Sequence, residues 1–362
     1  MKNMLNNKIK IFVALSGGVD SAVTTALLVE QGYNVTGVFM KNWSGDEFGI
    51  QADCPWEKDQ KDAEAVCKKL NIPFRSFNFE KEYKEKVVEY FFSEYKAGRT
   101  PNPDVMCNRE IKFGIFLTKA KELGADYIAT GHYARVRQNE ATKEFELLKG
   151  LDSNKDQSYF LCELTQEQLK YSMFPIGEYT KPEIRKLAEE FDLPVAQKPD
   201  SQGICFVGEI NVAKFLRSNI DIHPGEIVDI DSKKTVGKHD GVEFYTIGQR
   251  EGLHIGGSKE PYFVVSKDKN ENIVFVAMGR DNAHLFSNQL KYDDILWVNK
   301  IENIELKNLT ASIRYRGNAE KGEIDIKNNK FTFSTQQRAV TEGQKIVFYE
   351  NDILRASATI IF

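Results

Sequence analysis

Apolar runs and helix-type patterns alternate along the first third of the chain. Between the runs, apolar positions recur at helical spacing over residues 21–33, around 66–70 and over 87–98. Strands that alternate with helices are typical of βαβ units, so this pattern predicts a parallel α/β sheet. The short β-rich runs that would form it occupy residues 8–15 (KIKIFVAL), 34–40 (NVTGVFM), 73–79 (PFRSFNF) and 125–130 (ADYIAT).

The pattern then becomes less regular. Residues 133–149 have the pattern of a β-hairpin and residues 151–158 that of a loop, and helical patterns follow over 165–173 and 181–191. Pro182 suits the first turn of the second helix, where a missing N–H costs no hydrogen bond. We expect this first domain to end near Val207.

The rest of the chain predicts two smaller β-rich domains. Strand patterns recur first at 225–230, 243–249, 262–267 and 272–278, and then at 311–317, 322–328, 330–335, 344–350 and 355–362. Short alternating segments with turn residues between them are typical of a small antiparallel barrel or sandwich. The predicted fold class is therefore α/β: a parallel-sheet domain over 1–207, a small central β-rich domain over 208–278 and a C-terminal antiparallel β-barrel over 279–362.

Composition narrows the setting. With 362 residues, 41% of them hydrophobic, the chain can build two or three cores. No stretch approaches the roughly 20 apolar residues that cross a bilayer, and the first ten residues lack the apolar run of a secretory signal, so we expect a cytoplasmic protein without membrane contact. A net charge of −4 excludes an overall basic body but not a local basic face for nucleic acid.

Residues 16–21 (SGGVDS) join the first predicted strand to the first predicted helix. Free backbone N–H groups and the positive end of the helix dipole converge at such a junction, which suits an anion. Gly17 and Gly18 allow close backbone approach to a ligand. The hydroxyls of Ser16 and Ser21 offer further donors, and Asp20 is placed to orient a metal or to cap the turn.

The SGGVDS motif is neither GxxxxGK[ST] nor GxGxxG. Between a strand and a helix it resembles the PP-loop of the N-type ATP pyrophosphatases, whereas the alternative is a plain turn capped by a serine. The resemblance implies ATP, with Mg²⁺, as cofactor. It also implies that the binding segment extends over Ala14, Leu15, Ser16, Gly17, Gly18, Val19, Asp20 and Ser21.

Two of the five cysteines stand in motifs that favour chemistry. Cys107 follows a stiff segment with two prolines, and Asn108 is placed to cap a helix from Arg109 to about Leu123, so the thiol would lie beside a helix N-terminus and tend towards thiolate. Asp104, on the same loop, is a candidate proton carrier, with an ordinary turn carboxylate as the alternative. Cys205 follows Gly203 near the end of the first domain, where buried packing is an equally good explanation.

The other three cysteines have no such motif. Cys67 lies in a helical pattern and is expected to pack in a core, and Cys54 and Cys162 receive no role. Because the five cysteines include no CxxC pair, we expect neither a zinc site nor a disulfide scaffold, and no metal ligated by the protein alone.

Seven motifs taken in order resemble the tRNA-specific 2-thiouridylase family, and the likeness covers nearly the whole chain. Long motifs that agree in sequence, order and approximate spacing are far more specific than SGGxDS alone. The motifs are SGGVDS (16–21), GRTPNPDVMCN (98–108), TGHYAR (130–135), LDSNKDQSYFL (151–161), SQGICF (201–206), TIGQREGLHIGG (246–257) and RYRG (314–317).

This resemblance implies ATP-dependent 2-thiolation of the wobble uridine, position 34, of certain tRNAs. In the family reaction ATP adenylates O2 of the uridine, and AMP then leaves. Cys205 would carry sulfur as a persulfide delivered by a sulfur-donor protein, either a cysteine desulfurase or a sulfur-relay protein. Cys107 would release the product, leaving a transient Cys107–Cys205 disulfide. The implied partners are tRNA and the sulfur donor, and we expect a monomer.

The resemblance also implies binding positions. Met40 and Gly131 match ATP contacts at the carboxyl ends of predicted strands, with core packing and a simple turn as alternatives. Asn102, Pro103 and Asp104 match residues that meet the flipped target base, with a turn as the alternative. Contacts with tRNA are implied for His132, Lys155, Asp156, Gln157, Arg314, Tyr315 and Gln344.

Two of these tRNA contacts need a further remark. For Lys155, Asp156 and Gln157, a solvated polar turn is the alternative explanation. Residues 314–316 are expected to alternate on a strand, so that Tyr315 would face away from both flanking arginines.

Two other functions compete with thiolation. The first is another PP-loop ATP pyrophosphatase that acts on a small metabolite and needs neither paired thiols nor an RNA surface. The second is a tRNA-binding protein whose nucleotide site is regulatory or degenerate. Intact SGGVDS, Asp104, Cys107 and Cys205 weigh against the second of these.

Overall fold

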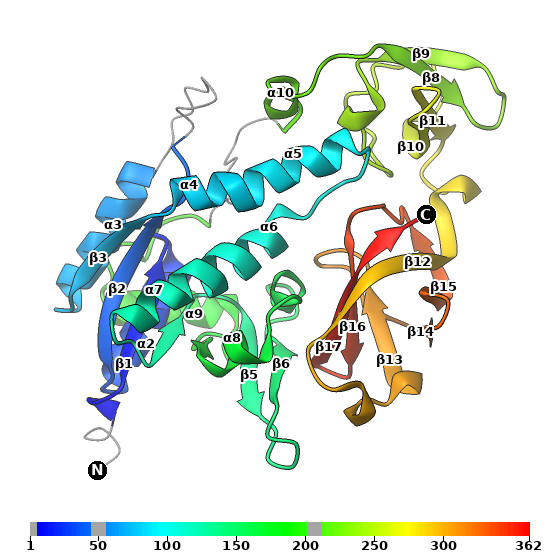
Figure 1. Cartoon of the computed structure of the whole chain (residues 1–362). Coiled ribbons are helices and arrows are strands. Elements are labelled where there is room, and N and C mark those ends of the chain that lie inside the picture. Colours follow the sequence, from blue (N-terminus) through cyan, green and yellow to red (C-terminus); the bar gives the residue numbers. More distant parts are fainter. Residues whose placement is uncertain (1–5, 45–55, 201–211) are drawn as a thin grey trace.

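Three bodies of secondary structure make up the protein in the computed structural model, which describes residues 6–44, 56–200 and 212–362 (Figure 1). The α/β body holds a five-stranded parallel sheet in the order β3-β2-β1-β4-β7, which confirms the predicted sheet. Its strands are β1 (Lys10–Leu15), β2 (Asn34–Lys41), β3 (Phe74–Asn78), β4 (Tyr127–Ala129) and β7 (Ser172–Met173).

Helices cover both faces of this sheet, because β1 alternates apolar side chains between them. Leu15 packs in a cluster with residues of α2, α3 and α9, whereas Phe12 and Ala14 pack in a cluster with residues of the helices from α4 to α7. The helices are α2 (Val19–Glu30), α3 (Trp56–Lys69), α4 (Glu80–Tyr83), α5 (Glu89–Lys96), α6 (Pro103–Met106), α7 (Phe116–Glu122), α8 (Gln166–Lys170) and α9 (Lys181–Glu190).

The prediction of a helix over 165–173 is wrong at its end. A capping box between Thr165 and Gln168 starts α8, but the helix stops at Lys170 and Ser172–Met173 forms the edge strand β7. The helix predicted over 181–191 is confirmed, with Pro182 in its first turn.

The central body is a four-stranded sheet in the order β10-β11-β8-β9. Its strands are β8 (Gly225–Asp229), β9 (Thr235–His239), β10 (Tyr262–Asp268) and β11 (Ile273–Met278). The strand predicted over 243–249 is wrong. Residues Val242–Phe244 form a 3-10 turn, and Gly248 has φ +84°, which breaks the extended backbone.

The last body is a closed antiparallel barrel, as predicted. Its strands pair in the order β12-β15-β14-β13-β16-β17, and β12 also pairs with β17, which closes the ring. The strands are β12 (Phe286–Trp297), β13 (Leu309–Ser312), β14 (Glu320–Asp325), β15 (Lys330–Arg338), β16 (Lys345–Glu350) and β17 (Ile353–Ile361).

The predicted hairpin over 133–149 is confirmed as β5 (Ala134–Gln138) and β6 (Phe145–Lys149), but it belongs to the barrel's sheet. Strand β6 pairs with β17, with Leu147 opposite Leu354. The α/β body is therefore joined to the barrel by main-chain hydrogen bonds.

A second joint links the α/β body to the start of the central segment. Phe215 of α10 (Val212–Arg217) lies 5.0 Å from Phe92 of α5 and 5.9 Å from Trp43, measured between ring centroids. Over the described ranges, no helix combines the length and the apolar character that a membrane span requires.

Candidate active site

The SGGVDS loop lies at the carboxyl edge of the parallel sheet, between β1 and α2. Two serines shape it: the Ser21 hydroxyl accepts from the Ser16 N–H at 3.2 Å and donates to the Gly18 carbonyl at 3.1 Å. The two hydroxyl oxygens are 3.2 Å apart. Because Gly18 caps α2 without a side-chain hydrogen bond, N–H groups at the helix start stay available to an anion.

Two glycines make this packing possible. Gly17 has φ +74°, and a Cβ there would lie 2.4 Å from the carbonyl oxygen of Asp59 in α3. At Gly131, just beyond β4, a Cβ would lie 2.7 Å from the Ser21 nitrogen. Gly131 is therefore not a simple turn residue, since its backbone lies against the helix start that the loop forms.

Asp20 is held by residues far along the chain. The Tyr133 hydroxyl donates to its Oδ1 at 2.9 Å and Lys181 Nζ donates to the same oxygen at 2.6 Å. Burial and the neighbouring Asp20 raise the pKa of Tyr133, so the hydroxyl stays protonated as a donor. Lys181 also contacts Asp200 at 2.8 Å.

Asp200 gathers three cations beside the loop. Lys155 Nζ lies 2.7 Å from its Oδ2, and Arg185 lies 2.5 Å from its Oδ1, the oxygen that Lys181 also contacts. Burial alone would raise the pKa of Asp200, but hydrogen bonds from Lys155 and Lys181 outweigh it and lower the pKa to about 2. The carboxylate is thus ionised wherever the protein is folded near neutral pH.

Lys198 ties the same segment to the loop. Its Nζ donates to the Gly17 carbonyl at 3.0 Å and pairs with Asp59 at 2.7 Å and Asp62 at 2.5 Å. Five of these residues were not predicted from the sequence: Tyr133, Lys181, Arg185, Lys198 and Asp200. The TGHYAR motif, which holds Tyr133, and the KPD segment just before the SQGICF motif were possible signals.

Cys107 lies in a different setting from the one predicted. The helix begins at Pro103, not Arg109, and its N-cap is Asn102, which accepts from the Val105 N–H at 3.2 Å. Cys107 therefore follows the first turn and opens a π-helical stretch, η3 (Cys107–Ile115), of a kind frequent at functional sites.

The expected thiolate is also wrong for this arrangement. Cys107 is 1% exposed, and burial raises the pKa of its thiol, an effect that the positive charge of Lys112 offsets only in part. The charge of nearby Asp104 raises this pKa further. Cys107 is thus a neutral thiol here, and Asn108 bonds the Phe160 carbonyl at 3.1 Å instead of capping the helix.

Gln344 lies beside the segment that carries Asn102. Its Nε2 donates to the carbonyl oxygens of Thr100 at 3.0 Å and Pro101 at 2.8 Å, and its Oε1 accepts from Asn102 at 3.4 Å. The Thr100 N–H donates to the carbonyl of Glu342 at 2.9 Å. The structure therefore brings together two predicted site residues, Asn102 and Gln344, that are 242 positions apart.

The central body reaches the same segment. The hydroxyls of Thr100 and Thr246 are 3.3 Å apart. Lys267 Nζ donates at 2.7 Å both to the Gly98 carbonyl and to the Tyr245 carbonyl. Residues 98–102 are therefore held by all three bodies of the protein.

His132 does not match its predicted role at a tRNA surface. It is 7% exposed, its Nδ1 lies 2.7 Å from the Thr130 hydroxyl, and its ring packs 5.9 Å from that of Phe113. Burial, together with Lys112, lowers the pKa of His132 well below its usual range. The His132 ring is thus a neutral, buried group packed against Phe113 and Phe174.

The three residues of the KDQ motif are engaged within the protein. Lys155 bonds Asp200, as described above. The Asp156 carboxylate accepts from the N–H groups of Gly150 and Ser158. Gln157 Oε1 accepts from the Tyr133 N–H at 3.0 Å. The motif thus helps to hold Asp200 and Tyr133 next to the SGGVDS loop. Its contact with tRNA stays a prediction.

Arg314 and Tyr315 lie in a turn, so the expected strand over 314–316 is wrong. Strand β13 ends at Ser312, whose hydroxyl donates to the Arg314 carbonyl at 2.8 Å, and Arg316 has φ +58°. Tyr315 packs on Phe160, with ring centroids 4.3 Å apart. Because the segment turns, the strand argument that set Tyr315 against its flanking arginines no longer applies.

The remaining predicted positions are Met40 and the other cysteines. Met40, near the carboxyl end of β2, packs against the same apolar cluster as Ala14 and Cys107. Cys54 and Cys205 lie outside the described residues. Cys67 and Cys162 are buried free thiols, which confirms the packing role expected for Cys67.

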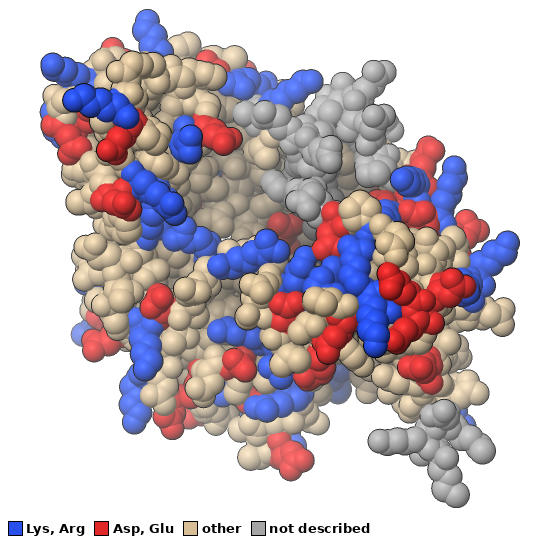
Figure 2. Space-filling view, turned by 180° about the vertical axis from the view of Figure 1, so that it is seen from behind, with Lys and Arg blue, Asp and Glu red and all other residues tan. Residues whose placement is uncertain are grey.

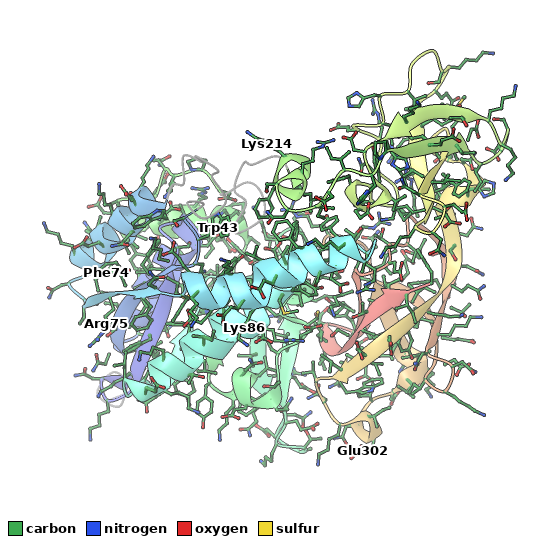
Figure 3. All side chains as sticks on the ribbon, turned by 45° about the horizontal axis from the view of Figure 1, so that its top comes forward. Trp43, Phe74, Arg75, Lys86, Lys214 and Glu302 are labelled. Carbon is green, nitrogen blue, oxygen red and sulfur yellow. The ribbon has the colours of Figure 1, made fainter. Side chains whose placement is uncertain are left out.

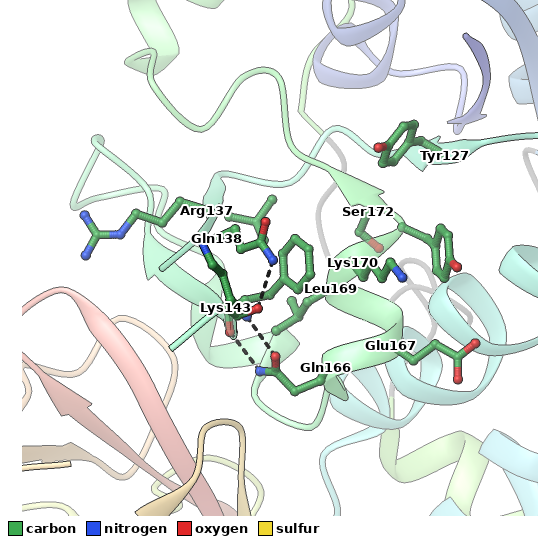
Figure 4. Close-up of a pocket in the computed structure, with 12 residues that line it drawn as sticks. Tyr127, Arg137, Gln138, Lys143, Gln166, Glu167, Leu169, Lys170 and Ser172 are labelled. Carbon is green, nitrogen blue, oxygen red and sulfur yellow. Dashed lines mark hydrogen bonds between the residues drawn. The ribbon is translucent and has the colours of Figure 1, made fainter. Parts of the chain in front are cut away.

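A cavity of about 770 Å³ lies elsewhere, between the β5–β6 hairpin and α8 (Figure 4). Tyr127, the first residue of β4, and Ser172, the first residue of β7, both line it. The amino ends of parallel strands lie at the edge opposite the SGGVDS loop, so this cavity is not the nucleotide site. Within 6–44, 56–200 and 212–362, no cluster of three or more His, Cys, Asp or Glu forms a metal site.

Known protein families match most of this chain. Residues 9–209 match the family described as tRNA methyl transferase HUP domain, 213–278 the tRNA methyl transferase PRC-barrel domain, and 287–360 the aminomethyltransferase beta-barrel domain. The solved structure of NMN synthetase from Francisella tularensis is only weakly similar, with a TM-score of 0.33 and 16% identity over 53% of this chain and 66% of that one.

Full-length relatives are much closer. The tRNA-specific 2-thiouridylase MnmA of Oceanobacillus iheyensis is 48% identical over 99% of this chain and 96% of its own length. Proteins of the same name from Listeria monocytogenes serovar 1/2a and Staphylococcus aureus strain JH9 are each 48% identical, over 98% and 99% of this chain and 95% and 96% of their own lengths. Such identity across all three bodies shows that the chain belongs to the tRNA-specific 2-thiouridylase family.

Proposed function

We propose that this protein is a tRNA-uridine 2-sulfurtransferase that uses ATP to thiolate C2 of the wobble uridine, position 34. The observation that carries the proposal is the joint at residues 98–102, where the barrel and the central body hold the segment that leads into Asn102, Asp104 and Cys107. An enzyme for a small metabolite has no need to tie this segment to two accessory bodies. A macromolecular substrate that contacts all three bodies would explain why residues 98–102 are held by the barrel and the central body.

The SGGVDS loop is the part that we assign to ATP. N–H groups at the start of α2 and the hydroxyls of Ser16 and Ser21 suit the phosphates. Lys181 and Lys198, each paired with two carboxylates, lie beside them. The uridine O2 would attack the α-phosphorus, pyrophosphate would leave, and the poor leaving group at C2 would become AMP. Ala14, Leu15, Val19, Met40 and Gly131 would line the nucleotide.

Mg²⁺ fits this site through a single carboxylate. Both hydrogen bonds to Asp20 end on Oδ1, and no described residue bonds its Oδ2. Mg²⁺ is commonly bound by one or two carboxylates together with substrate phosphates, and needs no cage built by the protein. We assign Asp20 to this ion, which would neutralise charge on the phosphates.

Two thiols would complete the transfer. The terminal sulfur of a Cys205 persulfide would form a bond to C2 as AMP leaves, and the Cys107 thiolate would then attack Cys205 Sγ. That step breaks the S–S bond to the transferred sulfur, releases the 2-thiouridine and oxidises both cysteines to a disulfide, which a cellular thiol reductant must reduce. The buried, neutral state of Cys107 means that it must be exposed and deprotonated before this step.

The base and the tRNA would be held next to these thiols. We assign Asn102, Pro103 and Asp104 to the flipped uridine, with Asp104 as the proton carrier. Lys155, Arg314 and Tyr315 remain our proposed tRNA contacts. We further propose a monomer that works in the reducing cytoplasm and receives sulfur from a cysteine desulfurase or a relay protein.

Nucleoside mass spectrometry of tRNA incubated with the protein, ATP, a cysteine desulfurase and cysteine tests the function. We expect 2-thiouridine at position 34 that requires ATP and is absent when U34 is replaced by cytidine. The competing function, a PP-loop pyrophosphatase for a small metabolite, predicts pyrophosphate release that tRNA does not stimulate. That result, together with the absence of 2-thiouridine, would refute the proposal.

A further inference from the structure

Three arginines meet where the central body joins the barrel. Arg280 follows β11, Arg314 lies in the turn after β13, and Arg338 ends β15. Arg338 Nε donates to the Arg280 carbonyl at 3.3 Å, and Arg314 Nη2 donates to the Arg338 carbonyl at 2.7 Å. Main-chain oxygens therefore hold the three residues together, although their side chains carry like charges.

Few acidic groups neutralise the positive charges of these three arginines. Burial lowers the pKa of Arg338, and the charges of Arg280 and Arg314 lower it further, with Asp281 as the acid that opposes them. None of the three arginines forms an ion pair with a described carboxylate. Nη2 of Arg338 is buried without a hydrogen-bond partner in the described chain. A buried donor without a partner is unfavourable, so the Arg338 guanidinium has hydrogen-bonding capacity that the described chain does not use.

The TIGQ turn (residues 246–249), whose first residue also contacts Thr100, supports this cluster. A Cβ on Gly248 would lie 2.7 Å from the Ala339 Cβ, so the turn packs directly against the residue that follows Arg338. The Arg338 guanidinium lies 5.0 Å from the centre of the Phe263 ring, on β10 of the central body. Both contacts come from the central body and fix a barrel arginine, which is the arrangement expected of a built site.

The surroundings favour a long polyanion as ligand. On the face seen in Figure 2, Lys and Arg side chains are interspersed with those of Asp and Glu. Tyr315, next to Arg314, packs on Phe160, whose carbonyl accepts from Asn108 beside Cys107. The cluster is thus connected by direct contacts to the segment of the candidate active site.

We propose that Arg280, Arg314 and Arg338 bind a phosphodiester of the tRNA backbone at the seam between the central body and the barrel. The planar guanidinium group presents paired donors that match phosphate oxygens. The inference rests on the proposed function for the identity of the RNA. It adds Arg280 and Arg338 to the interface and gives the TIGQ turn a positioning role.

Binding of tRNA measured over a series of KCl concentrations tests this site. Arg280→Gln, Arg338→Gln and the double variant are compared with Arg75→Gln, which removes an exposed arginine on the edge strand β3 (Figure 3). We expect the double variant to lower the slope of log K against log salt by roughly 0.7–0.9, one phosphate contact, and the affinity by about five- to tenfold at 0.1 M salt. Arg75→Gln should leave both values unchanged.

The single variant Arg280→Gln and the binding of inorganic phosphate separate failure of the site from failure of the fold. Arg280→Gln changes an exposed side chain, so it tests the site even if Arg338→Gln fails to fold. An unchanged slope and affinity in the Arg280→Gln and double variants, with both folded, would overturn the site. Tight binding of inorganic phosphate alone, without a change in tRNA binding, would also overturn it. Absence of 2-thiouridine with the wild-type protein would instead refute only the proposed function, since the salt slope does not depend on catalysis.

Discussion

Gln344 of the barrel donates from Nε2 to the main-chain oxygens of both Thr100 and Pro101, at 3.0 and 2.8 Å. Its amide is therefore used to hold the segment that ends at Asn102, the cap of the helix carrying Cys107. The sequence suggested that Gln344 contacts tRNA. The geometry instead favours a positioning role, and the two roles predict different kinetics.

Gln344→Ala should lower kcat by up to about thirtyfold while the Kd for tRNA stays unchanged, because two hydrogen bonds of about 1 kcal/mol each are lost at the joint. Gln344→Glu should be worse than alanine, since a carboxylate would face two carbonyl oxygens. Gln337→Ala is the matched control, because that side chain bonds only to Thr335 on its own strand. Single-turnover thiolation and tRNA binding give the two readouts. A weaker Kd with unchanged kcat would support direct contact with tRNA instead.

Gly131→Ala should impair use of ATP without unfolding the protein. The added Cβ would lie 2.7 Å from the Ser21 nitrogen and 2.9 Å from the Asp20 carbonyl carbon, so the helix start must shift. We expect the KM for ATP to rise and tRNA-dependent pyrophosphate release to fall. At Gly256 nothing lies within 4 Å of an added Cβ, which makes Gly256→Ala the control. Equal kinetics for the two variants would show that Gly131 has no role at the loop.

Cys107→Ser and Cys205→Ser should each abolish thiolation while leaving tRNA binding and tRNA-dependent pyrophosphate release intact. The physical reason is that adenylation needs the loop and the base but no thiol, whereas sulfur transfer needs both thiols. Nucleoside mass spectrometry and a pyrophosphate assay separate the two steps. Cys67→Ala, at a buried thiol far from both motifs in sequence, should thiolate normally if it remains folded. Full thiolation by either serine variant would refute the two-thiol mechanism.

Lys267 should make stability rise with pH over a defined window. Burial lowers the pKa of Lys267 from 10.5 to about 8. Below pH 8 both states carry the proton, and the buried charge destabilises the fold. Between about 8 and 10.5 the unfolded chain binds more protons, so the free energy of unfolding increases with pH, by at most about 3 kcal/mol.

Urea unfolding across that window measures this effect as a difference between wild type and Lys267→Met. The difference cancels the titration of other groups, and Lys269→Met, an exposed neighbour, is the control. If wild type and Lys267→Met keep a constant difference from pH 7.5 to 10, the ammonium group is not destabilised by burial and the joint at Gly98 and Tyr245 must be more open.

Local signals explain what could be read from the residues alone. The parallel sheet, the barrel and the SGGVDS loop follow from periodicity and turn residues, which act over a few neighbours. The true helix start at Pro103 was also readable, because Asn followed by Pro is a strong N-cap and N1 pair. Placing the cap at Asn108 instead led to the wrong ionisation state for Cys107.

Other features depend on residues that only the fold brings together. The ionisation of Cys107 and His132 is set by burial, which no local pattern reveals. Tyr133 and Lys181 contact Asp20, and Asp200 contacts Lys181, so three distant segments meet at Asp20 only in the folded chain.

The sequence by itself determined the family motifs, the anion-binding loop and the two candidate thiols, since these depend on residue type and near neighbours. Only the fold shows that the barrel and the central body hold residues 98–102, and that three arginines from separate segments share one seam. The physical reason is that hydrogen bonds and charge clusters between distant segments depend on strand pairing and domain packing, neither of which is encoded at any single position of the chain.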